Sequence, residues 1–168
     1  MSVISFEEIM FTIMSATQDT FKSYMNIDLL AGKVDKRVDT VDSDVTGIVG
    51  VAGDRVGYII IATDRASAQI VAKEMLMEEE ADEDCIRDAV GELTNNIAGM
   101  FKTKYHEQYG SVALGLPLVV SGQLRMVADT ADTAGSDDHS SINVQCKGIT
   151  IPFTSADGRV SLKVMIYM

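Results

Sequence analysis

Hydrophobic residues recur at three- and four-residue steps in two long stretches, a spacing typical of amphipathic helices. The first stretch follows Ser5-Phe-Glu-Glu8, which has the pattern of a capping box, and runs to about Asn26. The second runs from about Asp82 to Glu107. A shorter helix, capped by Thr63 or Asp64, is predicted before it. The chain therefore has two long helices that each bury one face.

Between and after these helices the hydrophobic period changes to that of strands. Strands are predicted over residues 33–40, 45–52, 56–62, 112–120, 123–128, 142–153 and 160–167. Turns are expected at Gly53-Asp54, Ser121-Gly122 and 155–158. Glycines inside a strand often mark the close approach of another element, and Gly47, Gly50 and Gly57 lie inside the predicted strands. We expect a helix to cross the sheet there.

Both halves of the chain begin with an amphipathic helix and continue into antiparallel strands, which indicates a duplicated unit. The simplest fold is an α+β domain, with an antiparallel sheet and two long helices side by side on one face. At 168 residues the whole chain, 1–168, fits a single domain. The second face of the sheet would need cover from this chain or from another copy of it.

Composition excludes several classes of function. The net charge of −11 disfavours binding to nucleic acid, because few basic residues cluster anywhere. No apolar run approaches the length of a membrane span. The N-terminal sequence lacks the basic region of a signal peptide, and two cysteines outside a C-x-x-C spacing favour reduced thiols. We therefore expect a cytoplasmic protein.

Two acidic segments are weaker candidates for a metal site. The run 78–84 is better interpreted as a solvated turn that places negative charge before the next helix. The polar loop 129–139 contains Asp132, Asp137, Asp138 and His139, but their spacing matches no EF-hand loop. No metal is therefore predicted. Nucleotide-binding loops, zinc-protease motifs and nucleophile elbows are also absent, and only two histidines are available as bases.

The remaining candidate is the polar face of the second long helix. Opposite its apolar stripe lie Asp88, Glu92, Asn95 and Gly99. Glu92 and Asn95 are three residues apart and are neighbours on the helix surface. Small residues around them, Gly91, Ala98 and Gly99, would let another surface approach. Any solvated helix can carry such a pair, so its spacing alone does not establish a function.

A wider pattern is more specific. Asp88, Glu92, Asn95 and Pro117 form D-x3-E-x2-N-x21-P, which resembles the signature of the chemotaxis phosphatases CheC, CheX and FliY. The segments 43–50, 90–99 and 115–122 resemble the CheX branch in particular. CheC and FliY relatives carry an equivalent E-x-x-N on the first long helix. Here that helix offers Glu7 and Glu8 without a following Asn, which favours a single site.

The resemblance implies a CheC-like fold and a phosphatase that acts on the phospho-aspartate of a CheY-type response regulator. It assigns Asn95 to orient the attacking water and Glu92 to pair with a lysine of the regulator. Asp88 and Gly99 would contact the partner, and Pro117 would be structural. The protein would need no cofactor of its own, because the regulator would hold the Mg²⁺. The resemblance also implies a homodimer.

Two alternatives remain open from the residues. One is a binding module, an adaptor or flagellar switch-like domain that engages a regulator without catalysis. The intact E-x-x-N is the feature that favours the enzyme over this adaptor. The other is an unrelated α+β domain with a solvated helix, which would require the four-position pattern to be a coincidence.

Overall fold

The computed structural model describes residues 5–37, 41–124 and 148–168. It contains three helices within these ranges, α1 (Phe6–Met25), α2 (Arg65–Leu76) and α3 (Glu83–Tyr109). The strands are β1 (Leu29–Ala31), β2 (Val41–Ala52), β3 (Gly57–Thr63), β4 (Ala113–Leu114), β5 (Leu118–Leu124), β6 (Gly148–Ser155) and β7 (Ser161–Tyr167). The predicted α+β fold is confirmed.

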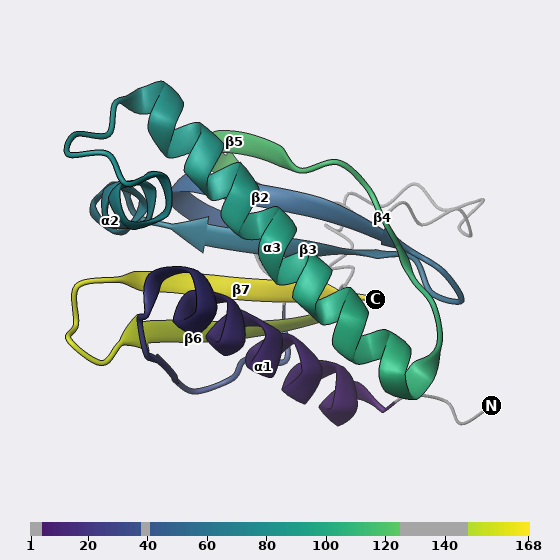
Figure 1. Cartoon of the computed structure of the whole chain (residues 1–168). Helices are drawn as coiled ribbons and strands as arrows, with labels where there is room; N and C mark the ends of the chain where they lie inside the picture. The colour runs from purple at the N-terminus through teal and green to yellow at the C-terminus, as the bar shows by residue number, and fades with distance from the viewer. Residues whose placement is uncertain (1–4, 38–40, 125–147) are drawn as a thin grey trace, which may run out of the picture.

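All the strands belong to one antiparallel sheet. Its order is β1-β6-β7-β3-β2, and β2 then pairs with both β4 and β5. Figure 1 shows α1 and α3 side by side across one face of this sheet, with α2 beside the start of α3. The arrangement confirms that the two long helices share one face.

The predicted duplication is also visible in the connections. The first half consists of α1, β1, β2 and β3, and the second of α3 followed by β4 to β7. The two halves exchange edge strands, because β1 pairs with β6 of the second half while β4 and β5 pair with β2 of the first. The halves also meet at the centre, where β3 pairs with β7.

Alternation along the strands places the core between the sheet and the helices. Ile59 and Ile61 of β3 face the helices and are fully buried. They pack in the same cluster as Phe21 of α1 and Phe101 of α3. Helix α1 starts as predicted, since the Ser5 hydroxyl accepts from the Glu8 amide and the Glu8 carboxylate accepts from the Ser5 amide. Its C-cap is Asn26, in the left-handed conformation.

Several strand predictions were wrong in detail. Residues 33–37 form no strand, and only Asp35 makes an isolated bridge, to Thr150. The strand predicted over 112–120 is interrupted between β4 and β5, and β5 runs through the predicted turn at Ser121-Gly122. The three-residue strand β1 was not predicted. The candidate metal loop 129–139 lies outside the described residues.

Candidate functional site

The candidate site is built on α3, and the start of this helix is fixed by its N-cap. The Asp82 carboxylate accepts a hydrogen bond of 2.8 Å from the Cys85 amide. This bond holds the pKa of Asp82 below its ordinary value, since it stabilises the ionised carboxylate. Glu83 and Asp84 follow in the first turn, where the helix dipole favours negative charge. The N-cap thus sets where the helical register begins.

A close contact with β2 fixes how α3 is rotated. Thr94 is fully buried, and its hydroxyl donates to the Val90 carbonyl at 2.6 Å. A Cβ atom on Gly47 would lie 1.9 Å from the Thr94 Oγ1 atom, so only glycine fits beneath the helix at this position. The prediction that a strand glycine marks a crossing helix is confirmed at Gly47. It was wrong at Gly50 and Gly57, where the nearest atoms belong to Tyr58 and Tyr167 of the sheet. Because Thr94 faces the sheet, its neighbour Asn95 is turned toward solvent.

The outward face of α3 carries the residues that the sequence pattern placed there. Asp88, Glu92 and Asn95 are exposed, and Gly99 is partly exposed. Within the described part of the chain, the side chains of Glu92 and Asn95 make no hydrogen bond or ion pair. A Cβ atom on Gly99 would have no neighbour within 4 Å. The site is a polar ridge on a rigid helix, open to a macromolecular partner.

Two of the small residues have a different role from the one expected. Gly91 is buried, and a Cβ atom there would lie 3.3 Å from the Val119 side chain of β5. Ala98 is fully buried as well. These residues let α3 approach the sheet and do not clear space around Glu92 and Asn95. Only Gly99 leaves the outer surface open.

Pro117 lies in the exposed link between β4 and β5. Just before it, the Gly115 amide donates to the Gly50 carbonyl at 2.9 Å. Just after it, Val119 pairs with Gly47 and packs against α3 at Gly91. Pro117 therefore lies where the chain joins the edge of the sheet beside α3, a position that fits a structural role.

Helix α1 repeats the burial pattern of α3 at an offset of 77 residues. Ile9, Ile13, Ala16 and Thr17 are buried like Ile86, Val90, Leu93 and Thr94. The equivalence extends to a hydrogen bond, because the Thr17 hydroxyl donates to the carbonyl four residues earlier, as the Thr94 hydroxyl does.

This equivalence places Ser15 and Gln18 where α3 has Glu92 and Asn95. The Gln18 amide is already in use, since its Nε2 atom donates to the Leu29 carbonyl at 3.1 Å. Glu8, which the sequence left as a possible acidic group on this helix, belongs to the capping box. At the positions equivalent to the site, α1 thus has no E-x-x-N pair, and only a comparison of the two folded helices identifies those positions.

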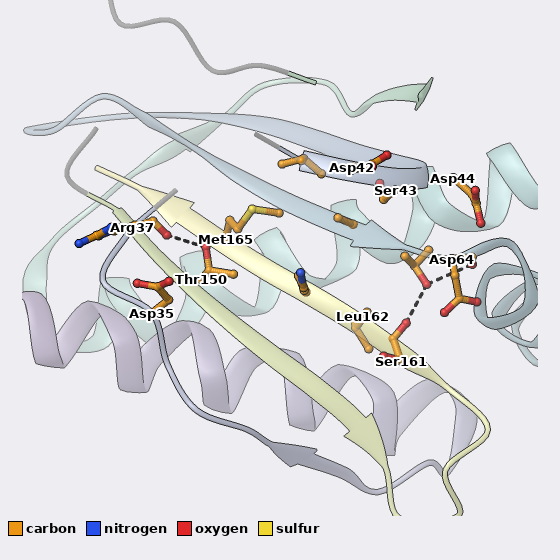
Figure 2. Close-up of a pocket in the computed structure, with 14 residues that line it drawn as sticks. Asp35, Arg37, Asp42, Ser43, Asp44, Asp64, Thr150, Ser161, Leu162 and Met165 are labelled. Carbon is orange, nitrogen blue, oxygen red and sulfur yellow. Dashed lines mark hydrogen bonds between the residues drawn. The ribbon is translucent and has the colours of Figure 1, made fainter. Parts of the chain in front are cut away.

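A pocket of about 500 Å³ opens on the opposite face of the sheet (Figure 2). It contains none of the predicted site residues. Two of its carboxylates have structural roles: Asp44 accepts from the Arg65 amide at 2.7 Å, and Asp64 caps α2 by accepting from the Ser67 amide. The Thr63 hydroxyl at the end of β3 donates to the carbonyl of Ser161, which is labelled in Figure 2, at 3.0 Å. Both carboxylates therefore hold the junction between the strand ends and the start of α2.

The described residues contain neither a metal-binding cluster nor a membrane-spanning helix. No set of three or more His, Cys, Asp or Glu side chains in those ranges is arranged to hold a metal ion. In the same ranges, no helix combines the length and apolar character that crossing a membrane requires.

Comparison with known proteins assigns the family. The family model described as chemotaxis phosphatase CheX matches residues 45–154, which include most of β2, the whole of α3 and Pro117. This chain belongs to the CheX family. No curated protein sequence matches it significantly.

Solved structures share the fold over nearly the full length. A CheX chemotaxis protein from Desulfovibrio desulfuricans is 24% identical with a TM-score of 0.77, covering 95% of this chain and 97% of that one. A CheC-like superfamily protein from a Shewanella species is 24% identical with a TM-score of 0.75, covering 98% of both chains. The CheX of a CheX-CheY-BeF3-Mg²⁺ complex from Borrelia burgdorferi is 24% identical with a TM-score of 0.66, covering 95% and 96%. The fold is therefore CheC-like.

Proposed function

We propose that this CheX-family protein dephosphorylates the phospho-aspartate of a CheY-type response regulator, with Glu92 and Asn95 as the residues it inserts. The observation that carries the proposal is the ridge on α3, where an exposed carboxylate and carboxamide stand one turn apart without partners among the described residues. The complex of the Borrelia burgdorferi CheX with CheY supports the class of partner.

The reaction requires little machinery from this chain. A water oxygen attacks phosphorus while the bond from phosphorus to the aspartyl oxygen breaks. The products are inorganic phosphate and the free aspartate carboxylate. The regulator holds the Mg²⁺ that neutralises the developing charge, and this chain brings no cofactor. What it adds is the position of the water, as an amide side chain does in GTPases.

Asn95 suits this role because a carboxamide both donates and accepts hydrogen bonds. Its backbone belongs to a helix that is fixed on the sheet through Thr94 and Gly47, so the carboxamide is presented from a rigid support. Glu92 lies one turn earlier on the same face and pairs with the regulator's lysine. Asp88 and Gly99 extend the contact at either end.

Decay of a phosphorylated CheY-type regulator from the same cell tests this mechanism, and α3 offers a matched control. Asn95→Ala should lower the dephosphorylation rate at least about 100-fold while the regulator still binds, because only the positioned water is lost. Asn96→Ala also removes a carboxamide, but from the next position round the helix. Because the Asn96 Nδ2 atom is buried, this variant should keep near-normal activity. Glu92→Ala should weaken both binding and rate. Full activity in the Asn95→Ala protein would overturn the mechanism.

The alternative is an adaptor that binds the regulator without catalysis. It uses the same exposed helix, so binding alone does not separate the two functions. The lifetime of the regulator's phosphoryl group does. Equal lifetimes with and without this protein would favour the adaptor.

We further propose a cytoplasmic homodimer, as the family resemblance implies. Strand β5 supports the dimer because within the described residues it pairs on one side only, with β2, and Leu118 on it is 58% exposed. An open edge of this kind can pair with a second copy. The molar mass in solution tests the proposal, and a monomeric mass at micromolar concentration would contradict it.

A further inference from the structure

The outward face of α3 does not end at Asn95. Lys102 and His106 follow Asn95 by seven and eleven residues, a spacing that keeps them on the same side of the helix as Asn95 and Gly99. Both side chains are exposed. At about 1.5 Å per residue, Lys102 lies about 10 Å and His106 about 16 Å along the axis from Asn95. The polar ridge is thus several turns long.

Lys102 and His106 line a shallow pocket of about 400 Å³ with Thr103, Glu107 and Ser111. The neighbouring Lys104 is engaged elsewhere, because its Nζ atom pairs with the Asp19 carboxylate of α1 at 2.7 Å. Lys102 has no ion pair within the part of the chain that the structure describes. It is therefore an available cation on the face that carries Glu92 and Asn95. Glu107 adds one carboxylate to the pocket, at about 100° round the helix from His106.

Charge along the ridge changes sign. Asp88 and Glu92 are acidic and precede Asn95, whereas Lys102 and His106 follow it. The cation is notable in a chain whose net charge is −11, because that charge repels an anionic partner. The acyl-phosphate pocket of a response regulator is anionic, since Mg²⁺ is held in proteins by carboxylates. A ridge that was acidic throughout would be repelled by such a pocket.

We propose that Lys102, with His106 as a second donor, binds a carboxylate on the rim of the regulator's phosphorylation site and so sets the direction in which α3 lies across that site. The inference rests on the proposed function. Glu92 meets the regulator's lysine at one end of the contact, and Lys102 meets its acidic rim at the other. The wrong direction would place like charges together at both ends.

The size of a protein interface supports this assignment. A specific interface buries about 800 Å² on each partner, far more than Glu92 and Asn95 can supply. Contacts must therefore extend beyond these two residues, and the direction along α3 past Gly99 is open to them, since nothing lies within 4 Å of a Cβ atom built there. Lys102 is the first charged side chain on that path.

Charge reversal tests the proposal with a matched control. Lys102→Glu should raise the half-saturating concentration of phosphorylated regulator about three- to tenfold at low salt, leave the maximal rate unchanged, and weaken the salt dependence of binding. Lys73→Glu makes the same change of net charge at an exposed position on α2 and should shift the half-saturating concentration less than twofold. His106→Gln should have a smaller effect than Lys102→Glu. Equal effects of Lys102→Glu and Lys73→Glu would overturn the proposal, as would a fall in maximal rate without a change in half-saturation.

A binding measurement separates failure of this inference from failure of the proposed function. The probe is the regulator loaded with Mg²⁺ and BeF3, measured by titration without turnover. If the wild type speeds dephosphorylation but Lys102→Glu binds as tightly as Lys73→Glu, only the present inference is wrong. If no variant dephosphorylates the regulator but Lys102→Glu alone binds weakly, the phosphatase function fails and the docking contact stands.

Discussion

At the scale of single residues, the site depends on a contact that involves neither Glu92 nor Asn95. Thr94 rests on Gly47, and the direction of Asn95 follows from that contact. Gly47→Ala would place a methyl group 1.9 Å from the Thr94 Oγ1 atom and 2.9 Å from its Cβ atom. We expect a loss of about 1–3 kcal/mol in the free energy of unfolding, since overpacking forces the helix or the strand to move. Dephosphorylation should fall as well, because the ridge moves with α3.

Gly50→Ala is the control for this prediction. Gly50 lies on the same strand with its neighbour Tyr58 3.9 Å from the Cβ position, an ordinary contact distance. Its free energy of unfolding should change by less than about 0.5 kcal/mol. Chemical denaturation of both variants measures the difference. If Gly47→Ala were as stable and as active as Gly50→Ala, the contact would not be what positions α3.

At the scale of secondary structure elements, the long helices could be predicted and the edge strands could not. Helix α3 has a sustained apolar stripe and an acidic N-cap, so its limits and its exposed residues follow from local spacing. Strand β1 has three residues and β4 has two, which is too short for any alternation to show. The Ser121-Gly122 pair predicted a turn, and Gly122 does have a positive φ of 94°, yet it pairs with Ser43 within β5. Pairing with β2, a partner about 80 residues earlier, decides the structure there.

The polar face of α3 was predictable for the same reason, but its surroundings were not. Asp88, Glu92 and Asn95 are exposed because their spacing opposes the buried stripe. The burial of Gly91 depends on Val119 of β5, and no local pattern contains that contact. The equivalence of Gln18 with Asn95 likewise rests on the matching buried faces of α1 and α3, which the local sequence does not show.

The start of α3 gives a prediction that depends on pH. The hydrogen bond from the Cys85 amide lowers the pKa of Asp82 in the folded state. The ionised Asp82 carboxylate therefore makes its full contribution to stability above its unfolded pKa of about 3.9. This contribution is lost as the pH falls through the lower pKa of the folded state. Asp82→Ala should lower Tm at pH 7, and the difference from wild type should shrink at pH 3. Thermal unfolding followed by circular dichroism at both values is the measurement.

Glu80→Ala serves as the comparison, because it removes an exposed carboxylate from the same acidic run without removing a cap. Its Tm should stay within about 1 °C of wild type at both pH values. A difference for Asp82→Ala that is equally large at pH 7 and pH 3 would show that the ionised carboxylate is not what stabilises the start of α3.

At the scale of the whole molecule, the exchange of edge strands makes the two halves depend on each other. Among the described residues, β1 pairs with β6 alone, and the partner of β3 on one side is β7. Residues 1–80 alone would therefore leave β1 without β6 and one side of β3 open. Helix α1 would also lose α3, the helix beside it in Figure 1. We therefore expect fragments 1–80 and 81–168 to be unfolded separately and to fold when mixed, because each supplies the strands that the other lacks. The amide dispersion of each fragment and of the mixture in nuclear magnetic resonance spectra measures this, and native-like dispersion of 1–80 alone would contradict it.

The same interdependence predicts that the full chain unfolds in one cooperative transition. A disturbance at the β1 end of the sheet should therefore reach Glu92 and Asn95 only through unfolding of the whole domain.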